Sequence, residues 1–206
     1  MKISTSILSA NDRIQAIKKL NNTNTDYIHF DVMDNKFVPN QSLSIKEIIE
    51  YANVCNKKID IHFMVEEPLN YLKEIKYINF HNITVHLEID NLENVIKELK
   101  KINTKIGLAI KPNTDINLLD KYLNDIDIIL IMSVEPGFGG QKFIENTPER
   151  IKIIKEKIKN KNIILEVDGG INNETIKLVD VDIAVAGSYI INADNYQHQI
   201  DLLKGE

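Results

Sequence analysis

The chain has 206 residues, of which 43% are hydrophobic and 27% charged, with a formal net charge of −5. This length fits one domain with a large core, so we expect a single domain over residues 1–206. The acidic balance argues against nonspecific nucleic-acid binding, and no apolar stretch reaches the roughly 18 residues that a membrane span needs. The N-terminus lacks the apolar region of a signal peptide, and the single cysteine, Cys55, favours a reducing compartment. We expect a cytoplasmic protein that binds neither nucleic acid nor membrane.

Apolar segments of strand length alternate along the chain with amphipathic segments of helix length. Eight segments are predicted as strands: 3–8, 27–31, 59–64, 83–85, 106–110, 128–132, 163–168 and 183–186. Each is followed by a helical signal, such as the i, i+3, i+4, i+7 spacing over 92–99 or the helix-start residues Asp12, Thr147 and Asn173. Strands rich in Ile and Val, without polar alternation, indicate a parallel sheet that is buried on both faces. The pattern predicts an α/β fold, a (β/α)8 TIM barrel; a doubly wound open sheet is the alternative, although it usually has fewer strands.

Polar side chains gather at the carboxyl ends of these predicted strands. They form three pairs spaced two residues apart and one lone carboxylate: His29 with Asp31, His62 with Met64, His86 with Glu88, and Asp168. Residues two apart share a face of a strand, and in TIM barrels the carboxyl ends of the strands build the active site. Mixed imidazole and carboxylate ligands suit Zn, Mn, Fe(II) or Co, so His29, Asp31, His62 and Asp168 are candidate metal ligands.

The two aspartates also suggest acid–base chemistry. If Asp31 and Asp168 face each other across the barrel mouth, they supply the two bases of a proton shuttle; in the simpler alternative, each is only a ligand or a cap. His86 and Glu88 are either a further ligand pair or supporting residues. His81 and His198 are expected at the surface.

Glycine and methionine mark the same end of the predicted barrel. Gly137-Phe138-Gly139-Gly140 follows the sixth strand and Gly187-Ser188 the eighth. Backbone N–H groups at such glycines can wrap a phosphate, although tight turns explain them equally well. Three methionines, Met33, Met64 and Met132, lie at or just beyond strand ends. They either fill gaps in the core or form a dry, polarisable wall over a developing anion.

Taken together, eight stretches of the chain resemble the ribulose-phosphate 3-epimerase family, in the family's order and from end to end. The matching segments are SILSAND (6–12), HFDVMDNKFVPN (29–40), DIHFMVEEP (60–68), TVHLE (84–88), GLAIKPNT (107–114), IMSVEPGFGGQKF (131–143), EVDGGIN (166–172) and AGS (186–188). MSVEPGFGGQ and DVMD with FVPN are the most specific of these. The resemblance implies a barrel of the ribulose-phosphate-binding type, a cytoplasmic homo-oligomer and a small phosphorylated ketose as substrate.

The resemblance also implies residue roles and an activity. It places one divalent metal ion on His29, Asp31, His62 and Asp168, with Asp31 as proton acceptor and Asp168 as proton donor. The implied reaction is the metal-dependent, reversible 3-epimerisation of D-ribulose 5-phosphate to D-xylulose 5-phosphate, in the pentose phosphate pathway, through a cis-enediolate. The implied substrate-binding residues are Ser6, His29, His62, Gly137, Phe138, Gly139, Gly140, Asp168, Gly169, Gly170, Gly187 and Ser188, and the implied enediolate-stabilising wall is Met33, Met64 and Met132.

Two features of the chain depart from the family pattern. Asn35 and Lys36 stand where the family has a Gly-X pair, and Thr5 stands where it has proline. Asn tolerates a left-handed backbone best after Gly, so we expect the loop to keep its shape. The alternatives are a family member acting on a six-carbon sugar such as allulose 6-phosphate, a metal-free barrel isomerase or lyase of phosphorylated intermediates, and a noncatalytic phosphate-sugar sensor.

Overall fold

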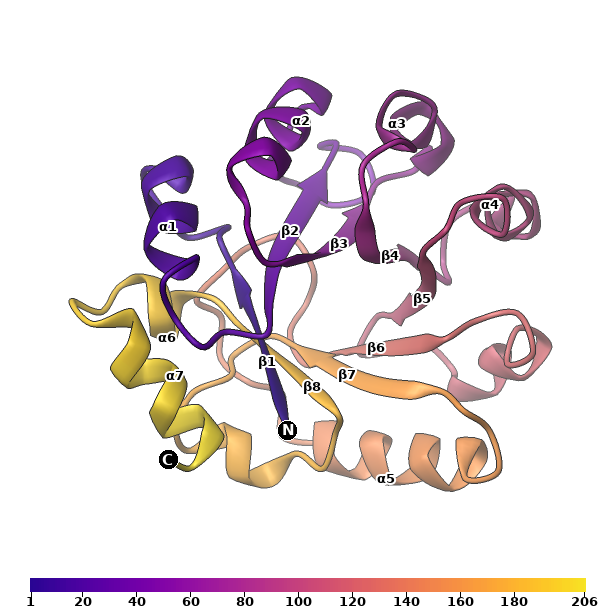
Figure 1. Ribbon diagram of the computed structural model, residues 1–206. Coiled ribbons are helices and arrows are strands. Elements are labelled where there is room, and N and C mark those ends of the chain that lie inside the picture. Colours follow the sequence, from indigo (N-terminus) through magenta and orange to yellow (C-terminus); the bar gives the residue numbers. More distant parts are fainter.

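The computed structural model describes residues 1–206 as a closed barrel of eight parallel strands, which pair in the order of the sequence, with the helices outside (Figure 1). The strands are Lys2–Ser6 (β1), Tyr27–Met33 (β2), Lys58–Met64 (β3), Phe80–His86 (β4), Lys105–Ile110 (β5), Ile128–Met132 (β6), Ile164–Asp168 (β7) and Ile183–Ala186 (β8). The α-helices are Arg13–Leu20 (α1), Ile45–Val54 (α2), Pro68–Ile75 (α3), Leu92–Leu99 (α4), Thr147–Ile158 (α5), Ser188–Ile191 (α6) and Tyr196–Lys204 (α7). The predicted TIM barrel is therefore confirmed.

Two of the eight connections differ from the expected α-helices. β5 is followed by the 3₁₀ helix Ile116–Lys121 (η1) and β7 by the 3₁₀ helix Thr175–Leu178 (η2). The prediction that Asn173 starts an α-helix is wrong: η2 has four residues and begins two positions later. Asp12, by contrast, caps α1, because its side chain accepts a hydrogen bond from the N–H of Gln15.

Several strand boundaries differ from the predicted ones, and the largest shifts are in β1, β4 and β2, which extends to Met33 instead of ending at residue 31. The first strand stops at Ser6 rather than at residue 8, since the Ser6 hydroxyl accepts the Leu8 N–H at 3.2 Å and turns the chain. The fourth strand is longer than predicted, Phe80–His86, and contains an irregularity where it pairs with Ile59 and Asp60 of β3.

Polar and apolar residues alternate along five of the eight strands. Most residues that face the helices are apolar and belong to a cluster of 50 buried residues, whereas the other set is polar on β1–β4 and β7. The polar set comprises Ser4, Ser6, His29, Asp31, Asp60, His62, Asn82, Thr84, His86, Glu166 and Asp168. The expectation of strands without polar alternation was therefore wrong: both faces are buried, but one packs on helices and the other lines the barrel interior.

Strand register brings these interior residues level with one another. β2 and β3 pair His29 with Asp60 and Asp31 with His62, and β1 adds Ser6 beside His29. On the far side of the barrel, β6 and β7 pair Met132 with Asp168. Register thus places the predicted site residues in adjacent layers at the carboxyl ends of the strands.

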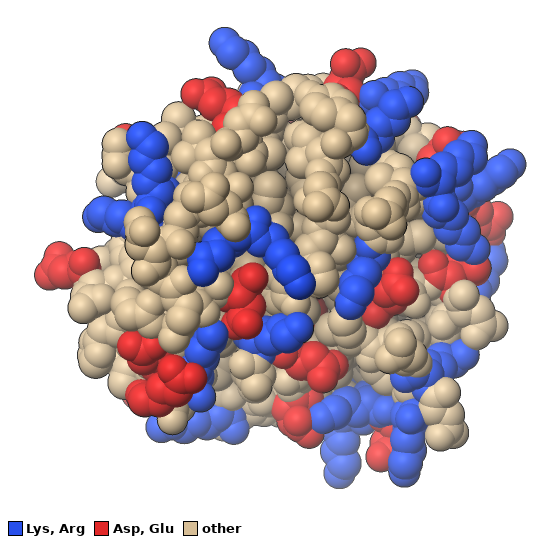
Figure 2. All heavy atoms as spheres, in the orientation of Figure 1, with Lys and Arg blue, Asp and Glu red and all other residues tan.

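Outside the barrel, charged side chains of both signs are interspersed on the face shown in Figure 2, and neither sign forms a continuous patch there. No helix is both long enough and apolar enough to cross a bilayer.

Candidate active site

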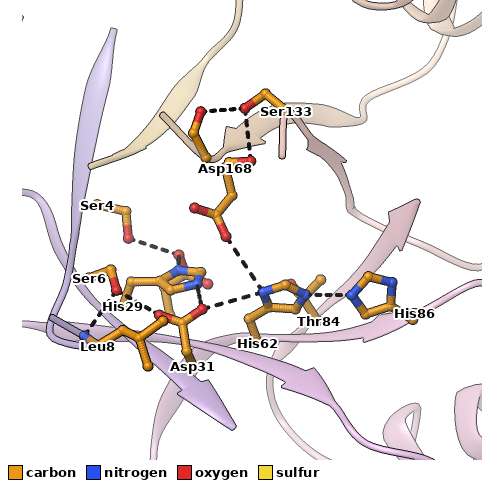
Figure 3. A network of polar contacts seen from close by, with 12 residues as sticks. Ser4, Ser6, Leu8, His29, Asp31, His62, Thr84, His86, Ser133 and Asp168 are labelled. Atoms are coloured by element: carbon orange, nitrogen blue, oxygen red, sulfur yellow. Dashed lines mark hydrogen bonds and ion pairs between the residues drawn. The ribbon is translucent and has the colours of Figure 1, made fainter. Parts of the chain in front are cut away.

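Four side chains from three strands converge inside the mouth of the barrel (Figure 3). The Oδ1 atom of Asp31 lies 3.3 Å from Nε2 of His29 and 3.7 Å from Nδ1 of His62. Nδ1 of His62 is in turn 3.8 Å from Oδ2 of Asp168, which reaches in from β7. One ligand-type atom from each of the four lies within 4.8 Å of the others, so the structure brings the predicted metal-ligand set together.

In both His29 and His62, one ring nitrogen has a hydrogen-bond partner, which leaves the other ring nitrogen available to a metal ion. Nδ1 of His29 lies 2.6 Å from Oδ2 of Asp60, a carboxylate that also accepts from Ser4 at 2.8 Å and from Asn82 at 2.5 Å. Nε2 of His62 lies 2.9 Å from Nε2 of His86. Nε2 of His29 and Nδ1 of His62 are both buried without a hydrogen-bond partner. Two orphaned imidazole nitrogens facing two carboxylates are what a divalent cation with mixed N/O ligation requires.

The two carboxylates have opposite protonation tendencies. Burial alone would raise the pKa of Asp31, but the charge of His29 and the contacts with His29 and His62 lower it well below its ordinary value. Ser6 adds a hydrogen bond to Oδ2 of Asp31 at 2.6 Å. Burial, followed by the negative charge of Asp31, raises the pKa of Asp168 to about 7. A pair of carboxylates set apart in this way can hold one proton between them near neutral pH.

The electrostatics of His29 follow from its two neighbours. Burial opposes its charged form, but the carboxylates of Asp60 and Asp31 outweigh burial and raise the pKa of His29 well above its ordinary value. A metal ion at this site therefore competes with a proton for Nε2 of His29.

The backbone after Asp168 can only be built with glycine. Gly169 and Gly170 have φ of +120° and +64°, in the region that side chains rarely adopt. A Cβ on Gly169 would lie 2.5 Å from the Val134 side chain, and one on Gly170 would lie 2.6 Å from the backbone nitrogen of Phe143. The pair lets the chain turn sharply beside the Asp168 carboxylate.

Above these groups lies a cleft that is open to solvent. Most of the residues predicted to bind substrate line it, together with the three methionines and Ser9. The predicted residues in its wall are Ser6, Asp31, Met33, Met64, Met132, Gly137, Phe138, Gly139, Gly140, Asp168, Gly169, Gly170, Gly187 and Ser188. His29 and His62 lie beneath the cleft, each with 0% exposure.

Sequence reasoning missed two buried carboxylates of the layer below. Asp60 bonds His29, and Glu166 is fully buried with no hydrogen-bond partner for either carboxylate oxygen. Burial, followed by the negative charge of Asp60, raises the pKa of Glu166 well above its ordinary value. The signal was present in the sequence, because Asp60 and Glu166 each precede a predicted ligand, His62 or Asp168, by two residues and so share its face.

The remaining histidines separate into different environments. His86 bonds His62 on one side and Glu88 on the other, so the pair does not join the four-residue cluster. His81 is half-buried and stacks on Tyr27 with ring centroids 4.8 Å apart, which corrects its expected surface position. His198 is exposed, as expected.

Both departures from the family pattern fit the structure. Asn35 has φ of +57°, so it adopts the left-handed conformation that the loop requires. Lys36, beside it, is exposed. The Thr5 hydroxyl is paired with that of Thr25 at 2.8 Å.

The fold and the site together define a TIM-barrel enzyme with two histidines and two carboxylates at the carboxyl ends of its strands. Residues 2–191 match the model of the ribulose-phosphate 3 epimerase family. The chain belongs to this family.

Curated relatives match along nearly their whole length. The chain is 34% identical over 215 residues to the ribulose-phosphate 3-epimerase of Bacillus subtilis, covering 100% of this chain and 99% of that protein. It is 38% identical over 217 residues to that of Buchnera aphidicola subsp. Baizongia pistaciae, with 98% and 95% coverage. Identity to that of Synechocystis sp. is 33% over 208 residues, with 96% and 90% coverage.

Solved structures support the fold alone, since their sequences are distant. KGPDC from Streptococcus mutans superimposes with a TM-score of 0.71 at 14% identity, covering 99% of this chain and 95% of that chain. 3-Hexulose-6-phosphate synthase from Salmonella typhimurium gives a TM-score of 0.68 at 14% identity, with 100% and 97% coverage.

Proposed function

We propose that this chain is a ribulose-phosphate 3-epimerase that interconverts D-ribulose 5-phosphate and D-xylulose 5-phosphate, a reaction of the pentose phosphate pathway. The observation that carries this proposal is the pair Asp31 and Asp168, which flank one point beside two orphaned imidazole nitrogens in a barrel of this family. Inverting C3 of a ketose requires one group to remove a proton and another to return it from the opposite side.

The chain's own residues supply both steps. Asp31, held ionised by His29 and oriented by the Ser6 hydroxyl, accepts the C3 proton. The substrate passes through a cis-enediolate. Asp168, whose pKa is raised to about 7, then delivers a proton to the other face of C3, and the roles exchange in the reverse direction.

His29, Asp31, His62 and Asp168 would hold one divalent metal ion, namely Zn, Fe(II), Mn or Co. When bound, such an ion acts as a Lewis acid that stabilises the negative charge developing on the C2 and C3 oxygens. The donor set of two nitrogens and two carboxylates fits all four metals.

The wall of the cleft divides into two parts with different roles. Met33, Met64 and Met132 belong to its apolar part, and they would exclude water from the enediolate. The glycine-rich loops after β6, β7 and β8 form its polar part and would receive the phosphate through backbone N–H groups. Ser6, His29 and His62 would contact the carbonyl and hydroxyl end of the ketose.

Two further predictions complete the proposal. We expect a homo-oligomer, as in the resemblance above, and a cytoplasmic location, in keeping with the single free cysteine.

The experiment compares D-ribulose 5-phosphate with D-allulose 6-phosphate as substrates of the purified, metal-loaded protein. The proposal predicts that kcat/KM is higher for the five-carbon substrate by at least about tenfold, the scale on which one extra substrate group is discriminated in a shaped pocket. A higher value for the six-carbon sugar would move the assignment to allulose-6-phosphate 3-epimerase. Turnover of neither ketose would overturn the proposal.

A further inference from the structure

A chain of three side chains leads away from the four-residue cluster into the wall of the barrel. Nε2 of His62 lies 2.9 Å from Nε2 of His86, and Nδ1 of His86 lies 3.0 Å from Oε2 of Glu88 (Figure 3 shows the two histidines). His62 and His86 are fully buried, and the Glu88 side chain is 20% exposed. None of the proposed catalytic steps uses His86 or Glu88.

Glu88 is anchored by groups of the loop after β5. Its Oε1 atom accepts the backbone N–H of Lys111 at 2.7 Å and the hydroxyl of Thr114. Arg150 of α5 fixes that loop in turn, because its Nη2 donates to the carbonyl oxygens of Lys111 and Thr114 at 3.2 and 3.0 Å. Oε1 is therefore fully engaged, and only Oε2 is directed at His86.

These contacts determine where each imidazole proton sits. A backbone N–H can only donate and a carboxylate can only accept, so Nδ1 of His86 must carry the proton that lies between His86 and Glu88. In a neutral ring, Nε2 of His86 then has a free lone pair. The proton between the two rings must therefore sit on Nε2 of His62.

The consequence appears at the other edge of the His62 ring. With its proton on Nε2, His62 presents a bare Nδ1 toward Asp31 and Asp168, and this is the buried nitrogen that has no hydrogen-bond partner. The opposite tautomer would aim an N–H at the position where a cation would bind.

We propose that Glu88 and His86 are positioning residues that fix the tautomer of His62 and so select its Nδ1 as the metal-ligating nitrogen. This inference rests on the proposed metal site, and it extends that site through two further side chains to the loop after β5. Partners that orient a metal-binding histidine in this way typically change metal affinity by about 10- to 100-fold when they are replaced.

Packing also restricts the His86 ring. Phe37, from the loop after β2, lies on it with ring centroids 4.7 Å apart, and Nζ of Lys111 lies 3.9 Å from the centre of the Phe37 ring. These contacts fix the plane of the His86 ring, but neither the Phe37 ring nor the Lys111 ammonium group favours one tautomer of His86 over the other. The tautomer is set by Glu88 alone.

The first test needs no variant. Nitrogen-15 NMR of the imidazoles of the metal-free wild-type protein, at a pH where both rings are neutral, should show His62 protonated on Nε2 and His86 on Nδ1. The opposite assignment for either ring would overturn the inference.

The second test uses Glu88→Gln, which keeps the size of the side chain. The fixed N–H of Lys111 would hold the amide oxygen of the new side chain and turn its NH₂ group toward Nδ1 of His86. In both His86 and His62, the ring proton would then move to the other ring nitrogen, so that Nδ1 of His62 becomes an N–H. We expect reversed tautomers and about 10- to 100-fold weaker Zn(II) and Co(II) binding, measured by competition with a chromophoric chelator.

Glu93→Gln is the matched control, since Glu93 is exposed on α4 and pairs only with Lys121. It should bind both metals as the wild type does. A Glu88→Gln protein that is folded by circular dichroism and binds metal with wild-type affinity would overturn this inference and leave the proposed function intact. Wild-type protein that binds no divalent metal would overturn both.

Discussion

The carboxylate of Asp31 and the imidazole of His62 face each other because β2 and β3 pair these two residues in register, with Oδ1 and Nδ1 3.7 Å apart. The same register places Asp60 beside His29 one layer below. A slip of one residue in this pairing would direct His62 toward the helices, because side chains alternate along a strand. The site is thus a consequence of strand register rather than of loop geometry.

Replacing each aspartate by asparagine should separate the two halves of the reaction. In Asp168→Asn, Asp31 still removes the C3 proton of D-ribulose 5-phosphate, so we expect exchange of that proton with D₂O but loss of epimerisation by at least about 10²- to 10⁴-fold. Asp31→Asn should show the reverse pattern: it should exchange the C3 proton of D-xylulose 5-phosphate with D₂O, but not that of D-ribulose 5-phosphate. NMR of each substrate in D₂O measures both quantities.

The control for these variants is their metal content, since both aspartates are proposed ligands. Elemental analysis should accompany each rate. Near-wild-type epimerisation by either variant would rule out the assignment of two bases.

Removing the metal should abolish turnover. Chelation followed by gel filtration is expected to leave a folded, inactive protein, and adding back Zn(II), Mn(II), Fe(II) or Co(II) should restore activity. Saturating metal should also raise the thermal midpoint, because a ligand that binds only the native state stabilises it, by about 2.7 kcal/mol at 100 times Kd. Full activity after chelation would favour the metal-free isomerase or lyase instead.

The stability of the metal-free protein should decrease as the pH falls through a range set by His86. Burial lowers the pKa of His86 to about 4 from an ordinary value of 6.5. As the pH falls, His86 is therefore protonated in the unfolded chain before it is protonated in the folded protein. The stability that depends on neutral His86 is fully present above pH 6.5 and is lost as the pH falls toward 4. The difference in pKa corresponds to roughly 3 kcal/mol in the free energy of unfolding.

Urea titrations of wild type and His86→Gln over this pH range measure that contribution. The wild type should lose more stability than the variant between pH 6.5 and 4. Parallel curves would show that His86 is not buried in its neutral form.

The loop after β2 offers a test of backbone strain at Asn35. Because its φ is +57°, Asn35→Gly should leave stability nearly unchanged, whereas Asn35→Ala should lower the free energy of unfolding by about 1 kcal/mol. The Asn91→Gly and Asn91→Ala pair is the matched control, since Asn91 has the same left-handed backbone conformation at the start of α4. Equal stability of Asn35→Ala and Asn35→Gly would contradict the inferred strain.

Much of the fold was predictable from the sequence, because most strands carry Ile, Val or Leu on the face that packs against the helices, and most helices carry an apolar stripe. Segments 106–110 and 128–132 coincide almost residue for residue with β5 and β6. The connections after β5 and β7 were not predictable in detail, since periodicity cannot separate a short 3₁₀ helix from the start of an α-helix.

The four ligand-type residues were also predictable, because the spacing of two residues in His29 and Asp31 reports a shared face within one strand. Contacts between strands were not, since they depend on register, which no local pattern specifies. The bond from Asp60 to His29 and the contact between His86 and His62 are both of this kind.

The central claim, a metal-dependent transfer of the C3 proton, is tested most directly by NMR of the wild-type protein with D-ribulose 5-phosphate in D₂O, with and without chelation. We predict that D-xylulose 5-phosphate forms with solvent deuterium at C3, and that both the product and the exchange disappear when the metal is removed. Product formed without deuterium at C3, or unchanged after chelation, would contradict the account.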